Sequence, residues 1–175
     1  MNNLVGERKI ILENEIKLKT VEQILKKLFK FQELSLEPII FEINESYGGP
    51  VILSIILYQI LRHSVADITT IVRKKAESGA LIAFQGGKVR KICKNATLKF
   101  HWTETELKKD FVMNFSSLDS TMSYVEKCNE QLYGVIIESS GLVWTKVIEF
   151  FQQKKVVSAR EAVRLNLADQ IIDDY

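Results

Sequence analysis

The chain has 175 residues, of which 46% are hydrophobic and 26% charged, with a formal net charge of +2. This length suits one compact domain, residues 1–175, and the composition excludes a disordered protein. The small net charge argues against nucleic-acid and membrane-surface partners. No apolar run reaches the ~20 residues of a membrane-spanning helix, and the first residues lack the apolar segment of a secretion signal. We therefore expect a cytoplasmic protein.

Strand and helix patterns alternate along the first hundred residues. We expect strands over 8–16, 38–44 and 67–72, helices over 20–31, 51–61 and 78–84, and short strands over 89–93 and 97–101. The helix over 51–61 is apolar almost all round, as a helix between a sheet and another layer would be. The alternation predicts an α/β fold in which helices cover parallel strands.

The final third of the chain is mostly helical. We expect helix from 118 to 151 with a break at 139–141, and a last helix over 159–167. Ser158 and Glu161 form a capping box at the start of that last helix. The stretch 122–137 carries more apolar residues than one helix needs on a single core face.

Cysteine and histidine are scarce in this sequence. Cys93 and Cys128 have no metal-like spacing, so we expect two buried thiols. His63 and His101 are the only histidines, so a histidine zinc site is not expected and a histidine base must be one of these two. We expect neither a metal nor a cofactor.

Two short segments carry the candidate chemistry. Gly48 and Gly49 lie between a strand and a helix, where free backbone N–H groups could bind an anion or a developing oxyanion; a plain turn is the alternative. Ser78 stands at the next helix N-terminus, and His101 closes a later strand that could return beside it as a base. For Ser78 the alternative is a simple helix cap.

Four segments together resemble the proteolytic subunit (ClpP) family of Clp proteases, within the ClpP/crotonase superfamily. The similar segments are 43–49 (INESYGG), 76–80 (AESGA), 94–102 (KNATLKFHW) and 158–169 (SAREAVRLNLAD). The resemblance spans about residues 8–172 and implies a ClpP/crotonase-like spiral of β-β-α units with a helical C-terminal third. It also implies a serine peptidase site.

The resemblance assigns roles to particular residues. It implies Ser78 as the nucleophile, His101 as the general base, and Gly48 and Gly49 as the oxyanion hole. The nucleophile position is ambiguous, because counting back from the next motif places Glu77 there instead.

The catalytic aspartate of the family corresponds to Lys154 in this chain. A lysine cannot accept the histidine N–H, and its charge disfavours the imidazolium formed during attack. Asp169, Glu149 or no residue at all then takes the carboxylate role. We therefore interpret the triad as degenerate.

Two functions follow from this interpretation. The first is a catalytically impaired pseudo-peptidase that serves as a structural or regulatory subunit of an oligomeric Clp-type assembly. The alternative is an active serine endopeptidase that cleaves peptides inside an oligomeric chamber. An acyl-CoA enzyme of the crotonase branch is less favoured, because the 158–169 motif is typical of the peptidase branch.

The resemblance also implies partners. We expect a homo-oligomeric ring, single or stacked, formed mainly through the helical region 118–151, with a homologous ClpP-type subunit as a further candidate in a mixed ring. Only residues 1–7 precede the first expected strand. This argues against an AAA+ unfoldase partner, which family members engage through a flexible axial loop.

Overall fold

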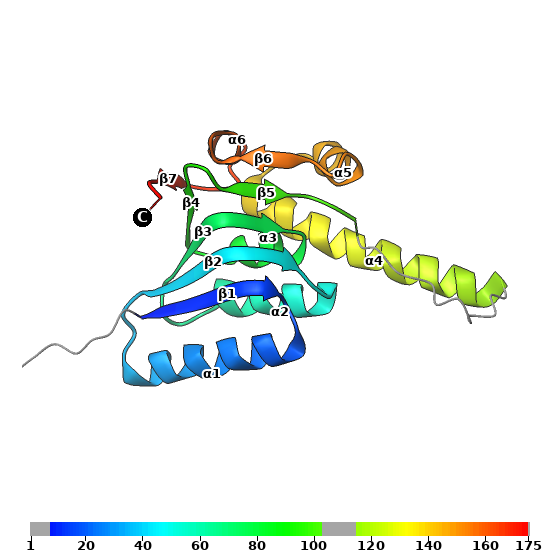
Figure 1. Cartoon of the computed structure of the whole chain (residues 1–175). Helices are drawn as coiled ribbons and strands as arrows, with labels where there is room; N and C mark the ends of the chain where they lie inside the picture. Colours follow the sequence, from blue (N-terminus) through cyan, green and yellow to red (C-terminus); the bar gives the residue numbers. More distant parts are fainter. Residues whose placement is uncertain (1–7, 103–114, 175) are drawn as a thin grey trace, which may run out of the picture.

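The computed structural model describes residues 8–102 and 115–174, and for 115–119 and 121 it describes the backbone alone. Its strands are β1 (Lys9–Glu15), β2 (Ile39–Gly48), β3 (Ile68–Glu77), β4 (Val89–Cys93), β5 (Thr97–Lys99), β6 (Val156–Ser158) and β7 (Gln170–Ile172). Its helices are α1 (Leu18–Leu34), α2 (Val51–Arg62), α3 (Gly79–Phe84), α4 (Phe115–Ser140), α5 (Trp144–Gln152) and α6 (Ala159–Arg164) (Figure 1).

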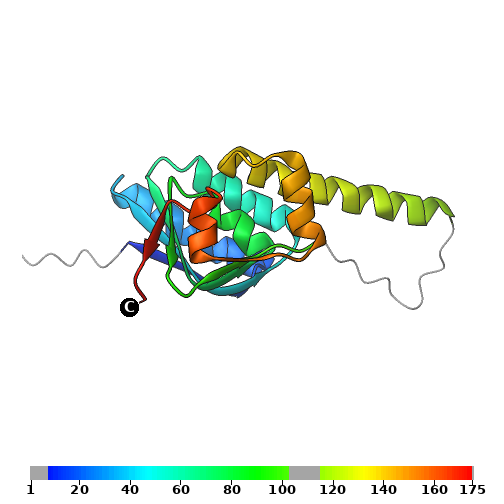
Figure 2. The same ribbon diagram turned by 90° about the horizontal axis from the view of Figure 1, so that it is seen from above.

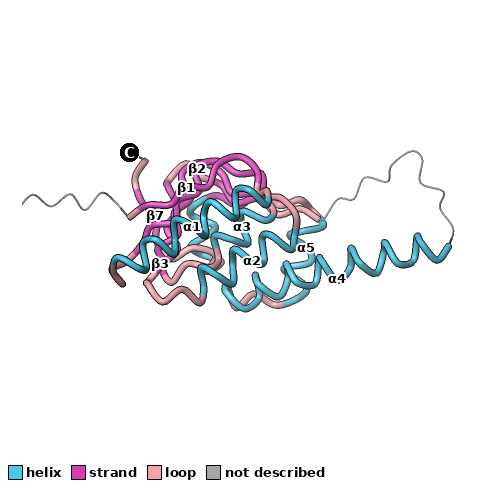
Figure 3. The backbone as a smooth tube through the Cα atoms, turned by 90° about the horizontal axis from the view of Figure 1, so that it is seen from below, coloured by secondary structure: helices cyan, strands magenta, loops and turns pink. Residues whose placement is uncertain are grey.

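The strands form one sheet in the order β1-β2-β3-β4-β7, with β5 pairing β3 and β6 pairing β5. Neighbouring strands run parallel, except that β6 is antiparallel to β5. Helices α1, α2 and α3 lie on the same side of the sheet (Figures 2 and 3). The expected α/β fold, with a largely parallel sheet covered by helices, is confirmed.

The core lies between the central strands and these helices. Phe41 and Val72, on β2 and β3, are fully buried, as is Phe84 at the end of α3. The hydroxyl of Thr70 donates to the Phe84 carbonyl at 2.8 Å, which ties β3 to the end of α3. This contact and the burial of these side chains place α3 against the two central strands.

Helix α2 differs from the sequence expectation. Leu57 and Leu61 are buried, whereas 55% of the Ile52 side chain and 37% of Ile56 are exposed. The helix packs on α3 and more weakly on α4 and α1, so the described residues cover only one of its faces. The interpretation of a helix enclosed between two layers is wrong for the part of the chain that the structure describes.

The two central strands run further than their apolar residues indicate. Their parallel pairing continues through Glu45 with Lys75 and Ser46 with Ala76, although a bulge interrupts it after Ile43. Residues 46–48, expected in a turn, therefore complete β2. The extension delivers the glycine pair and Ser78 to the same edge of the sheet.

The final third contains the expected break and cap. Helix α4 extends away from the body of the protein (Figure 1), and Gly141, with φ of +74°, follows its end. Met122 and Tyr124 are exposed on α4, whereas Leu132 is buried. The serine half of the predicted capping box is confirmed by a hydrogen bond of 3.3 Å from the backbone N–H of residue 161 to the Ser158 hydroxyl.

Residues 73–99 carry eight Lys and Arg side chains, and most of them form ion pairs. Carboxylates from other segments neutralise part of this charge: Arg73 pairs with Glu42, Lys88 with Asp67 and Arg90 with Asp169. Within the described ranges, no helix combines the length and apolar character that crossing a bilayer requires. Cys93 and Cys128 are free and buried, as expected.

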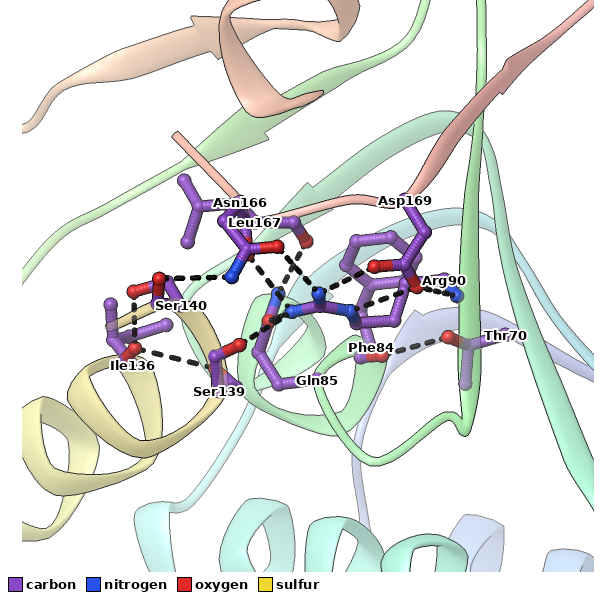
Figure 4. Close-up of polar contacts among 10 residues, drawn as sticks. All are labelled: Thr70, Phe84, Gln85, Arg90, Ile136, Ser139, Ser140, Asn166, Leu167 and Asp169. Atoms are coloured by element: carbon purple, nitrogen blue, oxygen red, sulfur yellow. Dashed lines mark hydrogen bonds and ion pairs between the residues drawn. The ribbon is translucent and has the colours of Figure 1, made fainter. Parts of the chain in front are cut away.

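Arg90 makes the densest polar cluster of the described chain (Figure 4). Its guanidinium donates to the Gln85 side chain at 2.9 Å and to the backbone carbonyls of Ser139 and Asn166 at 3.0 and 3.1 Å. It also pairs with Asp169 at 2.7 Å. One side chain of β4 therefore joins the end of α3, the end of α4 and the segment that leads into β7.

Candidate active site

Ser78 occupies a strained turn between β3 and α3. Its backbone angles are φ 48° and ψ −121°, a conformation that favours glycine, and its side chain makes no capping hydrogen bond. A serine in such a conformation costs on the order of 1–3 kcal/mol, and strain of this kind concentrates at functional sites. The alternative, that Ser78 is a simple helix cap, is therefore wrong, because its side chain does not cap α3.

The glycine pair lies against this turn with no space for side chains. A Cβ on Gly48, whose φ is +84°, would lie 2.6 Å from the Gly79 nitrogen and 2.7 Å from the carbonyl oxygen of residue 77. A Cβ on Gly49 would lie 2.2 Å from the Ile16 carbonyl oxygen. Glycine at 48 lets the end of β2 pass directly beside Ser78, and glycine at 49 lets the chain pass close to the backbone of Ile16.

The backbone N–H groups around Ser78 divide into engaged and available donors. The Gly48 N–H donates to the Ser46 hydroxyl at 3.3 Å, and the Ser78 N–H donates to the Lys99 carbonyl at 3.0 Å. Within the described residues, the N–H groups of Gly49 and Gly79 have no acceptor. These two amides are the donors available to a developing oxyanion. The contribution of Gly79 was not predicted, although its place directly after the serine could have indicated it.

His101 reaches the same place through β5. This strand pairs with the end of β3, with Glu77 opposite Lys99, so the chain leaves β5 beside the Ser78 turn. The ring Nδ1 of His101 lies 2.9 Å from the carbonyl oxygen of Trp102. Between the described side chains of Ser78 and His101 there is no direct hydrogen bond.

A cavity of about 380 Å³ joins the candidate residues. It is lined by Glu15, Tyr47, Gly48, Gly49, Pro50, Val51, Ser78, His101 and Trp102. The sequence-predicted serine, histidine and glycine pair are therefore brought together. Tyr47, Trp102 and Glu15 were not predicted as lining residues. Tyr47 and Trp102 lie in the family-like segments but are not the residues to which the resemblance assigns roles, and Glu15 lies outside those segments.

Glu77 does not face the cavity. Its carboxylate pairs with Lys75 at 3.0 Å and Lys99 at 3.4 Å. Burial opposes ionisation of Glu77, but the hydrogen bonds and charges of the two lysines outweigh it, so the pKa of this carboxyl lies below its usual range. Ser78, one residue later, is the side chain that lines the cavity.

None of the expected carboxylates contacts His101. Asp169 is held by Arg90, and Glu149 pairs with Lys146 at 2.9 Å. Lys154 lies exposed in the turn after α5, with φ of 47°, and it is absent from the cavity lining. The only carboxylate among the described lining residues is Glu15, which pairs with Lys17 at 2.8 Å.

Comparison with known proteins identifies the family. The whole chain, residues 1–175, matches the sequence profile of the Clp protease family. The protein belongs to the Clp protease family. No curated protein sequence gives a significant match.

The fold comparison agrees with this assignment. A point mutant of ClpP1 from Listeria monocytogenes superimposes with a TM-score of 0.81 at 16% sequence identity, covering 95% of this chain and 91% of that one. At this identity the likeness shows the fold alone, and it confirms the expected ClpP fold.

Proposed function

We propose that this Clp protease family member is a catalytically impaired, ClpP-like subunit with a structural or regulatory role in an oligomeric assembly. The observation that carries the proposal is the contact of His101 Nδ1 with the Trp102 carbonyl. In a working triad a carboxylate occupies this place and stabilises the imidazolium formed during attack. A neutral carbonyl orients the ring but supplies no compensating charge.

The surroundings of His101 support the same proposal. The position of the family's catalytic aspartate is Lys154, and the described carboxylates nearest to Lys154 in sequence, Glu149 and Glu161, pair with Lys146 and Lys155. Loss of the triad carboxylate function costs roughly 10⁴ in turnover in serine proteases of known mechanism. We therefore expect slow or undetectable hydrolysis of peptides.

The second candidate, an active serine endopeptidase, is favoured by the strained Ser78 turn. In that reaction His101 Nε2 takes the proton of the Ser78 hydroxyl while Oγ bonds to the peptide carbonyl carbon. The carbonyl electron pair moves to its oxygen, where the N–H groups of Gly49 and Gly79 donate to it. The intermediate then collapses, the C–N bond breaks, and the leaving amine takes the proton from Nε2.

Turnover of fluorogenic peptides separates the two candidates. We expect the wild type to give little signal above Ser78→Ala, and Lys154→Asp to raise turnover if the carboxylate alone is missing. Lys155→Asp, one residue further along the same turn, is the matched control for a change of charge. Robust wild-type turnover that Ser78→Ala abolishes would instead establish the active peptidase.

An oligomeric assembly is the second part of the proposal. Exposed Met122 and Tyr124 on the projecting α4, with Ile52 and Ile56 on α2, support association with further copies or with a homologous ClpP-type subunit. Residues 1–7, on which the argument against an unfoldase partner rests, lie outside the described residues. Analytical ultracentrifugation tests the assembly, since a single species at 20.1 kDa would contradict it.

A further inference from the structure

The contact between His101 and Trp102 fixes the direction of one hydrogen bond. A carbonyl oxygen can only accept, so the proton in this 2.9 Å contact belongs to His101 Nδ1. A neutral imidazole with its proton on Nδ1 carries its lone pair on Nε2. This is the tautomer that a general base requires, and here a backbone atom selects it.

The carbonyl belongs to a residue whose side chain is held by aromatic packing. The Trp102 ring lies edge-on to Tyr133, with centroids 5.9 Å apart, and tilted against Phe151 at 6.5 Å. Tyr133 and Phe151 contact each other at 4.9 Å. Contacts of this geometry stabilise by about 0.5–1.5 kcal/mol each beyond the burial of area.

The residue on the other side of His101 is anchored in the same cluster. The Phe100 ring contacts both Phe150 and Phe151 with centroids 5.3 Å apart, and its backbone N–H donates to the Lys155 carbonyl at 2.9 Å. His101 is therefore bracketed by two aromatic residues that pack on the α4–α5 region.

Tyr133 contacts the aromatic cluster through its ring and not through its hydroxyl. It is 96% buried, and its hydroxyl has no hydrogen-bond partner within the described chain. A buried, unsatisfied hydroxyl is unfavourable, so packing of the ring is what the position requires. This makes Tyr133→Phe a variant that keeps the packing and removes only the hydroxyl.

We propose that Trp102 is a positioning residue for His101. Its carbonyl holds the imidazole in the Nδ1–H tautomer, and its indole, packed on Tyr133 and Phe151, holds the carbonyl in place. The inference rests on the proposed function, since it takes Ser78 and His101 as the reactive pair. It adds that helix α4, through Tyr133, sets the geometry of the histidine that follows β5.

Nitrogen NMR of histidine-labelled protein tests this directly. At a pH where His101 is neutral, we expect one tautomer in the wild type, with the proton on Nδ1; the His101→Gln variant assigns the signals against His63. The single tautomer should persist in Tyr133→Phe and Trp102→Phe. It should give way to a mixture in Tyr133→Ala and Trp102→Ala.

Two results would overturn the proposal. One is a wild-type His101 that carries its proton mainly on Nε2, a measurement that needs no variant to fold. The other is a folded Trp102→Ala protein that keeps the single Nδ1–H tautomer, because the indole would then have no role in holding the carbonyl. Neither result depends on peptide turnover, so failure of the proposed function remains a separate outcome.

Discussion

The carboxylate of Asp169 accepts hydrogen bonds from both the backbone and the side chain of Arg90. One carboxylate oxygen accepts from the Arg90 backbone N–H at 2.6 Å and from Nε at 3.2 Å, and the other accepts from Nη2 at 2.7 Å. The guanidinium side chain is only 9% exposed. A buried cation with this many fixed acceptors is stabilising only while every one of them is present.

Asp169→Asn should therefore destabilise the protein by about 2–3 kcal/mol, because it leaves a nearly buried guanidinium without its counter-charge. Urea unfolding followed by circular dichroism measures the change. The matched control is Asp67→Asn, which breaks the exposed pair between Asp67 and Lys88 and should cost less than about 1 kcal/mol. Equal losses in the two variants would contradict the structural role of the Arg90 cluster.

Stability should fall at acidic pH. Burial opposes ionisation of Asp169, but the hydrogen bonds and charge of Arg90 outweigh it, so the pKa of Asp169 is lowered in the folded state. A lowered folded pKa contributes stability that is present above the unfolded value of about 3.9 and is lost as pH falls through the folded pKa. Urea unfolding between pH 3 and pH 6 should show this loss below about pH 4, with a shallower slope in Asp169→Asn. An unchanged slope in that variant would assign the loss to other carboxylates.

Gly48→Ala should disrupt both stability and the site. The new Cβ would meet backbone atoms of the Ser78 turn, and the φ of +84° is unfavourable for alanine, so we expect a loss of more than about 2 kcal/mol. Gly134→Ala is the control, because nothing lies within 4 Å of its Cβ in helix α4. That substitution should stabilise by about 0.5–1 kcal/mol. A tolerated Gly48→Ala would show that the end of β2 does not pass as close to Ser78 as described.

Ser78→Gly should stabilise the protein while removing its nucleophile. Glycine adopts φ 48° and ψ −121° without strain, so we expect a gain of about 1 kcal/mol in the free energy of unfolding. Ser78→Ala keeps the Cβ and should show no such gain, although both variants should lose labelling by a fluorophosphonate probe. If Ser78→Gly and Ser78→Ala are equally stable, the turn is not strained as the backbone angles indicate.

Much of the fold could be predicted because its signals are local. The strand over 89–93 and the Ser158 cap of α6 are predicted at their observed positions, since β-branched residues and cap chemistry act within a few residues. Strands β6 and β7 were missed because each has three residues and exists only through its partner, β5 or β4. The ends of β2 and β3 were missed for the same reason, since pairing extends them through polar residues.

The sequence predicts which residues form the candidate site, but it does not predict which atoms those residues contact. Ser78, His101 and the glycine pair carry motifs, so the sequence places them in one site. The partner of His101 is a backbone carbonyl, which has no residue-type signal. The engagement of Glu77 by Lys99 depends on the pairing of β3 with β5. The side of the sheet to which a side chain points follows from a register that the sequence alone leaves open.

The Arg90 cluster also bears on the order of folding. Arg90 and Asp169 are separated by 79 residues, and β7 can pair with β4 only after the intervening helices have been placed. We expect contacts that close so long a loop to form late in folding. The chain loses conformational entropy when the loop closes, before the contact contributes any stabilisation. Asp169→Asn should therefore accelerate unfolding in stopped-flow experiments and leave the refolding rate nearly unchanged. During folding, strands β1–β4 and their covering helices would then form before Arg90 binds the Asp169 carboxylate.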